Sequence, residues 1–314
     1  MTKLNPRVAF LVLCSVIAVD SVSSAQVFTF TTGAPDGRMA TASRPGNGVL
    51  EIESADDFIL ASQTTIDQAT FTGLLPSGAP LTNVTQVVVE IYRVLPLDST
   101  NPPSGNVPTR ANSPSDVAFD SRDSAVPNLT FLSSILNASF TAANSVVNGI
   151  HKIPNQTTGG EGAVTGEEVV FNVTFTTPFS LPAGHYFFIP QVKLSSGDFL
   201  WLSSAGPPAF VGDLQSWIRN ADLDPDWLRV GTDIIGGGTP PTFNGTFSLS
   251  GTVGVAPTNT PTSTPTSTPT SVPTGTPTAT PRPAVVVPTL NESGMLVFGL
   301  LIASAGLLLL VRRR

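Results

Sequence analysis

Alternating apolar and polar positions recur along the middle of the chain. Three segments alternate strictly: 27–31, 169–177 and 245–253. In the second of them, Phe171, Val173 and Phe175 fall on one face. A period of two residues is typical of β-strands that bury one face. Longer apolar runs predict further strands at 66–72, 84–94, 185–194 and 199–202.

Clusters of Gly, Pro, Asn and Ser separate these segments, as turns between strands require. Only 131–147 and 213–221 have a pattern compatible with helix. The chain therefore predicts an all-β fold, a single β-sandwich over residues 26–255, of which the jelly roll is one form. Two long loops, 96–123 and 151–168, are expected at its edges, and Asp56-Asp57 is interpreted as a turn before a strand at 58–60.

The first 25 residues have the layout of a secretory signal peptide. Lys3 and Arg7 precede the apolar run 8–19, and small residues lead to a cleavage site between Ala25 and Gln26. A first transmembrane helix is the alternative, but the run is short. We expect signal peptidase to process the chain.

Cys14 is the only cysteine and lies inside this segment. Lipidation there is the other interpretation, but Leu13 stands where a small residue is expected. After cleavage the chain has no cysteine, which excludes disulfides and thiol catalysis from the mature protein.

Residues 256–286 form a Thr/Ser/Pro-rich stalk in which proline recurs every four positions from Pro257 to Pro281. Proline removes backbone donors, and the segment has little to bury, so a disordered, extended spacer is expected. Its hydroxyl groups suit O-glycosylation, with an unmodified linker as the alternative.

The chain ends with an uncharged apolar run at 295–311, followed by Arg312, Arg313 and Arg314. Seventeen residues are at the short end for a membrane-spanning helix. The arginine cluster would remain cytoplasmic, which leaves the domain at 26–255 outside the membrane. A buried core helix and a GPI-anchor signal are the alternatives, and neither typically ends in an arginine cluster.

A short motif precedes the apolar run and the three arginines; its residues are Val287, Pro288, Thr289, Leu290 and Gly294. With these residues the segment 287–314 resembles the IPTL-CTERM sorting signal, a relative of the PEP-CTERM tails of Gram-negative bacteria. The resemblance implies an exosortase-type membrane enzyme that recognises and processes the tail. Val287 replaces the usual Ile, and Ser293 replaces the common Trp. The expected location is the cell surface or the extracellular space, with membrane anchoring before the tail is processed.

Charge narrows the possible partners. Between residues 26 and 255 the chain has 20 acidic and 9 basic residues, a net charge of −11. Such a surface does not favour nucleic acid, but it attracts cations.

One acidic segment has the spacing of calcium ligands. Asp222, Asp224, Asp226 and Asp233 occupy positions one, three, five and twelve of a loop, and Ca²⁺ takes hard oxygen ligands. However, Trp227 stands where an EF-hand loop has its glycine. The alternative is an acidic surface loop whose aspartates cap turns, with no cofactor at all.

A second acidic loop contains Asp116, Asp120 and Asp123 beside Arg110 and Arg122. Ion pairing within this loop is the favoured interpretation.

All three tryptophans, Trp201, Trp217 and Trp227, fall within 27 residues. Exposed, they would stack on sugar rings; buried, they would be large core residues.

Candidate catalytic chemistry is sparse. There is no Gly-x-Ser-x-Gly nucleophile motif, and His151 and His185 lack zinc spacing. A glycosidase would need a placed carboxylate pair, for which Glu161, Glu167 and Glu168 are candidates. The sequence therefore favours an exported, non-catalytic binding or matrix protein that engages extracellular polysaccharide. The alternatives are a secreted hydrolase with a carboxylate pair and a purely structural coat component.

Overall fold

A computed structural model describes residues 26–254, except 47, 77–78, 96–104, 106, 152, 154–155 and 205–210. The signal peptide, the stalk and the sorting tail predicted above lie outside the described residues and stay predictions. Within the part that is described, no helix has the length and apolar character needed to cross a membrane.

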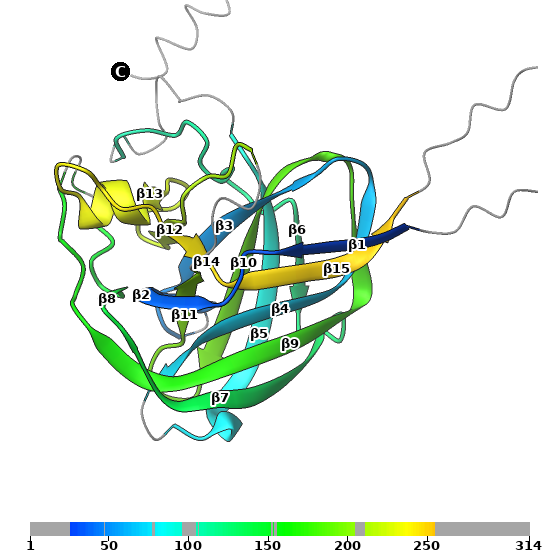
Figure 1. Ribbon diagram of the computed structural model, residues 1–314, viewed down its shortest axis with the longest axis horizontal. Coiled ribbons are helices and arrows are strands. Elements are labelled where there is room, and N and C mark those ends of the chain that lie inside the picture. Colours follow the sequence, from blue (N-terminus) through cyan, green and yellow to red (C-terminus); the bar gives the residue numbers. More distant parts are fainter. Residues whose placement is uncertain are drawn as a thin grey trace, which may run out of the picture. The chain divides into compact units, whose positions relative to one another are not determined.

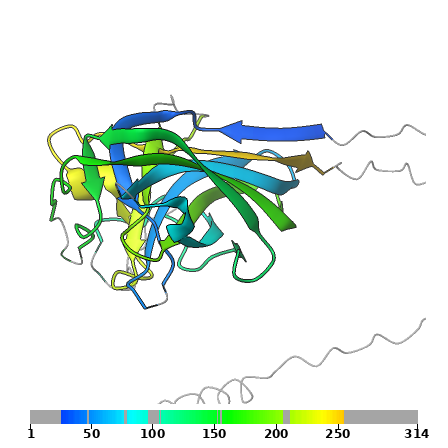
Figure 2. The same cartoon turned by 90° about the horizontal axis from the view of Figure 1, so that it is seen from below.

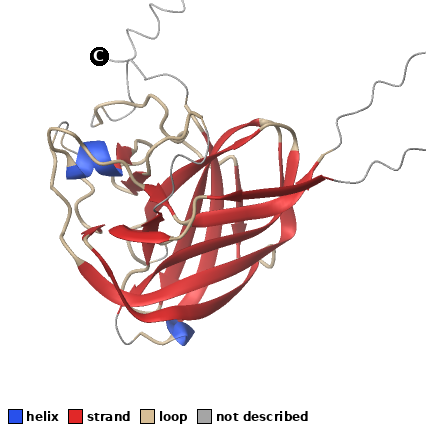
Figure 3. Cartoon of the chain, viewed as in Figure 1, coloured by secondary structure: helices blue, strands red, loops and turns tan. Residues whose placement is uncertain are grey.

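Strands dominate the described residues, and the only helical segments are two single turns (Figure 3). The strands are β1 (Gln26–Thr31), β2 (Pro35–Ala42), β3 (Ile52–Leu60), β4 (Thr64–Pro76), β5 (Val84–Arg93), β6 (Asp120–Asp123), β7 (Thr130–Ala142), β8 (Asn144–Val146), β9 (Val164–Leu181), β10 (Gly184–Leu194), β11 (Leu200–Ser204), β12 (Trp217–Asn220), β13 (Leu228–Arg229), β14 (Asn244–Gly245) and β15 (Phe247–Val253). The helical turns are η1 (Leu81–Asn83) and η2 (Val230–Ile235). The prediction of an all-β fold is confirmed.

The strands form two sheets (Figures 1 and 2). The larger sheet has nine strands and the path β1-β15-β4-β11-β2-β8, with β9 and then β7 added beside β4 and β14 beside β11. The smaller has six strands in the order β13-β12-β3-β10-β5-β6. Strand pairing is antiparallel except between β2 and β8.

Inward-facing side chains of both sheets share one hydrophobic core. Phe71 of β4 and Phe171 of β9 are paired across the strands, and their rings stack with centroids 4.9 Å apart. Phe188 of the six-stranded sheet stacks on Phe247 of the nine-stranded sheet at 4.8 Å. The Phe188–Phe247 pair joins the two sheets, and the Phe71–Phe171 pair extends the same core within the larger sheet. Apolar area removed from water is the main stabilising term of such a core.

Two predictions of local structure are wrong. The segment 131–147, considered for a helix, forms β7 and β8, and 213–221 contains β12. β7 pairs with β9 from Thr130 to Ala142, so cross-strand hydrogen bonds outweigh a weak local preference.

Asp56-Asp57 is also not a turn, because both residues lie buried inside β3. There they face Phe188 and Phe187 of β10 across the sheet. Pairing with β10 continues the strand through two residues that disfavour strands on their own.

Gly251 of β15 lies at a bulge where the chain approaches β4 closely. A Cβ atom there would lie 1.9 Å from the carbonyl oxygen of Thr65. We predict that Gly251→Ala lowers the free energy of unfolding by about 1–3 kcal/mol, because the backbone must shift to admit the methyl group. Urea unfolding of the chain followed by tryptophan fluorescence measures the effect. Gly238→Ala is the matched control, since nothing lies within 4 Å of a Cβ there; equal losses would contradict the packing described.

Candidate functional site

The outer face of the six-stranded sheet, turned away from the shared core, carries a connected group of polar side chains. Arg219 of β12 is paired directly with Glu53 of β3. Glu90 and Tyr92, two residues apart on β5, point to the same face. Sheet order therefore brings together side chains from three strands that are distant in sequence.

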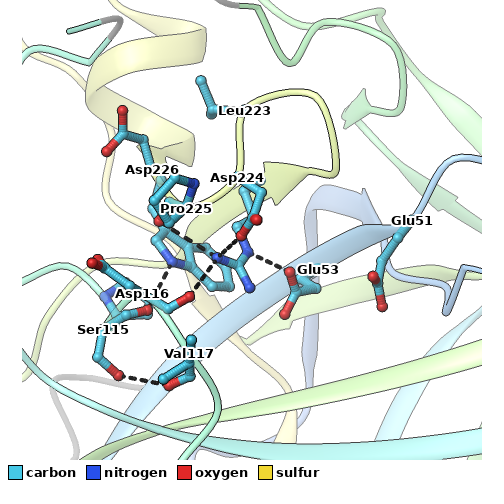
Figure 4. Close-up of polar contacts among 12 residues, drawn as sticks. Glu51, Glu53, Ser115, Asp116, Val117, Leu223, Asp224, Pro225 and Asp226 are labelled. Atoms are coloured by element: carbon cyan, nitrogen blue, oxygen red, sulfur yellow. Dashed lines mark hydrogen bonds and ion pairs between the residues drawn. The ribbon is translucent and has the colours of Figure 1, made fainter. Parts of the chain in front are cut away.

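Arg219 is the centre of this group. Its Nε donates to Glu53 Oε2, and its Nη2 donates to the Tyr92 hydroxyl at 2.8 Å. The Tyr92 hydroxyl in turn donates to Glu53 Oε1 at 2.8 Å, which closes a ring of three side chains. Nη1 lies 2.6 Å from Asp224 Oδ1 and donates to the carbonyl oxygen of Pro225 at 3.4 Å (Figure 4). We call Arg219, Glu53, Tyr92 and Asp224 the Arg219 network.

Aromatic rings enclose the same guanidinium. Its carbon lies 4.4 Å from the ring centroid of Trp227 and 5.3 Å from that of Tyr92. Arg219 and Glu53 side chains are both only 6% exposed. A buried ion pair persists only where further hydrogen bonds satisfy its remaining donors and acceptors, and the network supplies them. Burial alone would lower the pKa of Arg219, but the charge of Glu53 raises it.

A second buried arginine braces the adjoining loop. Arg110 donates to Asp116 and, at 2.9 Å, to Asp226, which is fully buried. The Trp227 indole donates to the carbonyl oxygen of Ser115 at 3.3 Å. These contacts fix the segment around Asp116 against the turn that precedes β13.

An open pocket of about 300 Å³ lies beside the Arg219 network. Its lining includes the carboxylates of Glu51, Glu53, Asp116 and Asp224, with Tyr92, Arg219 and the exposed Val117. Figure 4 places Glu53, Asp116, Asp224 and Val117 around this space, which we call the outer pocket. Gln191 donates to Glu51 at 3.0 Å, so that carboxylate too is oriented by a neighbour.

Glu90 lies next to the pocket lining and has an unusual protonation state. Burial, and then the charge of Glu53, raise the pKa of Glu90 from 4.5 to about 8. Burial and the charges of Glu53 and Glu90 likewise raise the pKa of Tyr92 well above its ordinary value. At neutral pH the site therefore holds a protonated Glu90 beside the arginine-bound Glu53.

This arrangement offers fixed hydrogen-bond acceptors to a ligand. The acceptors are carboxylate oxygens of Glu51, Asp116 and Asp224 that arginines or an amide already orient, while the donors of Arg219 and Tyr92 are used within the network. With four carboxylates and a single arginine lining it, the pocket has an excess of negative charge. It therefore suits neutral or cationic ligands with several hydroxyl or amino groups and disfavours anions.

The three tryptophans are buried, at 2% exposure or less. Trp201 lies in the core shared by the sheets, while Trp217 and Trp227 pack under the loop that covers the outer face of the smaller sheet. Their placement does not support the interpretation of an exposed stacking surface, and the core alternative describes them. Trp227 contributes to the site indirectly, as the ring beneath Arg219.

The four aspartates of the calcium-like spacing are divided among different partners. Asp224 pairs with Arg219, Asp226 with Arg110 and Asp233 with Arg229, while Asp222 is exposed. Among the described residues, no three His, Asp or Glu side chains gather as a metal site would require. Calcium binding stays a prediction from spacing, and these placements favour its alternative, aspartates that stabilise turns.

Several of the other predicted carboxylates have structural partners. Arg110 pairs with Asp116 and Arg122 with Asp120, so the prediction of ion pairing in the second acidic loop is confirmed for these pairs. Glu161 accepts hydrogen bonds from the amides of three consecutive residues, 147–149. Such a carboxylate caps a turn, and Glu167 and Glu168 lie apart from it on β9.

Sequence reasoning missed a second buried acidic group. Asp57 contacts His185 Nε2 at 2.5 Å and accepts from the amide of Leu214 at 2.9 Å. Asp56 is fully buried, and neither of its oxygens has a hydrogen-bond partner of good geometry. Burial, with the charges of Asp57 and Asp213, raises its pKa well above the ordinary value, although nearby backbone amides oppose the shift.

Fold and site together define an all-β protein with a pre-organised acidic pocket on the outer face of its smaller sheet. No protein-family model, curated protein or solved structure matches the chain.

The raised pKa of Glu90 predicts a pH dependence of stability. Between about pH 4.5 and pH 8 the unfolded chain has lost this proton while the folded chain retains it. The contribution of Glu90 is therefore fully present below pH 4.5 and is lost as the pH rises to about 8. We expect Glu90→Gln to remove most of this decline, roughly 3–5 kcal/mol, measured by urea unfolding from pH 4.5 to pH 9.

Asp67→Asn is the control for this measurement, because Asp67 is a partly exposed carboxylate on β4 of the other sheet. Parallel pH profiles for the wild-type chain and Glu90→Gln would show that Glu90 ionises normally in the folded protein.

Proposed function

We propose that the chain is an exported, surface-displayed protein whose β-sandwich domain binds polysaccharide in the outer pocket without turning it over. The observation that supports this proposal is that arginines hold three of the pocket carboxylates in fixed positions. Glu53 and Asp224 are held by Arg219, and Asp116 is held by Arg110. A rigid set of oriented acceptors lowers the entropic cost of binding a hydroxyl-rich ligand.

The chemistry of the pocket selects among polysaccharides. Its excess of carboxylates favours neutral sugars and amino sugars over sulfated or uronic acid polymers. Its volume of about 300 Å³ is at the lower end of the range for ligand sites. It therefore takes a short stretch of a chain, one end or one branch, rather than a long extended segment.

Surface display is supported by the order of segments along the chain. A predicted signal peptide at 1–25 precedes the domain, and the predicted stalk and the IPTL-CTERM-like tail follow it. In this arrangement the stalk holds the pocket away from the membrane. At about 3.1 Å per residue, an extended stalk of this composition gives a reach of several nanometres.

The hydrolase alternative rests on Glu90 and Glu53. Two neighbouring carboxyl groups whose environments separate their pKa values are the usual arrangement for general acid and base roles. Glu90, with its pKa of about 8, would be the acid. Against this alternative, Glu90 is not among the residues that line the outer pocket, and Glu53 is closed off by Arg219 and Tyr92.

Binding is tested by closing the pocket without touching the Arg219 network. Val117 lines the pocket and is 73% exposed, so Val117→Arg should leave folding intact. We predict that it weakens retention on neutral or amino-sugar polysaccharides by at least about tenfold, through steric exclusion. The measurement uses the full chain, immobilised, and a panel of polysaccharides that includes anionic ones.

Val126→Arg is the matched control, since Val126 is 56% exposed and lies away from the pocket. Retention that survives Val117→Arg would exclude the outer pocket as the binding site. Steady release of reducing ends, abolished by Glu90→Gln, would establish the hydrolase instead.

Surface display has its own test. We predict that deleting 287–314 releases the protein into the medium or periplasm, because the apolar run and the arginine cluster are removed together. Fractionation of cells with an antibody against the domain measures this, and Arg312→Ala alone is the mild comparison. Membrane retention of the truncated chain at the level of the intact chain would refute anchoring by the tail.

A further inference from the structure

β7 is an unprotected edge of the nine-stranded sheet. Within the described residues it pairs only with β9, and Figure 1 shows it at the margin of the sheet. It extends over thirteen residues, most of them exposed. An edge strand presents unpaired amide and carbonyl groups that can join another strand.

The usual protections of an edge are scarce here. Thr130–Ala142 contains no proline and no charged residue. The register of β7 shifts twice beyond Ile135, and its far end is tied to β2 by the hydrogen bond from the amide of Ala143 to Gly37. The stretch Thr130–Ile135 keeps a regular register and remains available for pairing.

Other edges in the described residues are better protected. β6 carries Asp120, Arg122 and Asp123, while β8 and β13 have three and two residues. β1 is uncharged but has only six residues. β7 is thus the longest uncharged edge of the described part of the molecule.

Apolar side chains mark the same edge. Across the outer face of the nine-stranded sheet, the neighbours of Leu132 are Asn172 and then Thr70, which are polar. Leu132 itself is 77% exposed, and Leu136 is 57% exposed. The polar pattern of this face is therefore interrupted by leucines where the sheet ends, as expected where another strand packs.

We propose that β7 pairs edge to edge with β7 of a second copy of this chain, in antiparallel orientation. Two copies with a net charge of −11 between residues 26 and 255 repel one another, and an uncharged edge is where they approach at least electrostatic cost. The chain's own stalk is a poor occupant, because a proline at every fourth position removes the amides that a ladder needs. A two-fold axis through the edge makes the contact self-complementary and limits it to two copies.

Pairing through about six residues buries little area, so we expect weak association in dilute solution. Tethering at a membrane raises the effective concentration of neighbouring copies, which favours such a contact. This last step rests on the proposed surface display; the pairing itself does not.

Cysteine cross-linking of the full chain tests the contact. Cys14 is the only native cysteine, so a Cys14→Ser background carries single new cysteines at successive positions of 130–135 and at Thr29 of β1. With the chain at high protein concentration in detergent solution, and separately in lipid vesicles, mild oxidation should give disulfide-linked dimers at one position of β7, with the yield falling for positions two residues away. This profile is specific to antiparallel pairing, because parallel strands would cross-link at every position alike.

Leu132→Asp, added to the variant that cross-links, should lower the dimer yield at least about tenfold, because a charge replaces an apolar contact at each interface. Val126→Asp is the control and should leave the yield unchanged. Absence of dimers along β7, equal yields along it, dimers at Thr29→Cys instead, or insensitivity to Leu132→Asp would each overturn the proposal. None of these outcomes depends on polysaccharide binding, so this experiment tests β7 pairing independently of the function proposed for the outer pocket.

Discussion

The burial of one guanidinium group shapes the outer face of the smaller sheet. Arg219 is nearly removed from water between Glu53, Tyr92 and the ring of Trp227. An arginine in that position stabilises the fold only while every partner stays in place, since an unpaired buried charge costs several kcal/mol. The positions of β3, β5 and β12, and of the loop around Asp224, are therefore interdependent. The outer pocket takes its form from this constraint.

The same constraint makes two neighbouring carboxyl groups, Glu53 and Glu90, behave differently. Glu53 remains bound to Arg219, while Glu90, buried beside it without such a partner, retains its proton to about pH 8. The protonated carboxyl group of Glu90 therefore lies near the outer pocket but does not line it. That arrangement fits binding better than turnover, because the groups a substrate would contact are already engaged.

Much of the fold follows from local pattern. β9 and β15 alternate because one face of each is buried against the shared core, and β1 alternates because Phe28 and Phe30 pack on that core half-buried. The same reasoning does not predict β7, because most of its residues are exposed and its Ser-rich sequence has no clear period. The local pattern also fails to predict that Asp56 and Asp57 lie inside β3. Their position depends on pairing with β10, which is distant in sequence.

The site was less predictable than the fold. Arg219 and Glu53 are 166 residues apart, and only sheet order brings them together. The one local hint was the alternation of Trp217, Ile218 and Arg219, which puts the arginine on the same face as a tryptophan. Of the three tryptophans, Trp227 lies at the candidate site, as a buried ring beneath Arg219 rather than as a contact surface.

The account depends most on the coupling between Arg219 and Glu53, and a double-mutant cycle measures it directly. Unfolding free energies of the wild-type chain, Arg219→Met, Glu53→Gln and the double variant give the interaction energy of the pair. We expect about 2–3 kcal/mol, with the double variant more stable than the sum of the single losses implies. Strictly additive losses would show that the two side chains act independently, and the outer pocket would then lose its proposed rigidity.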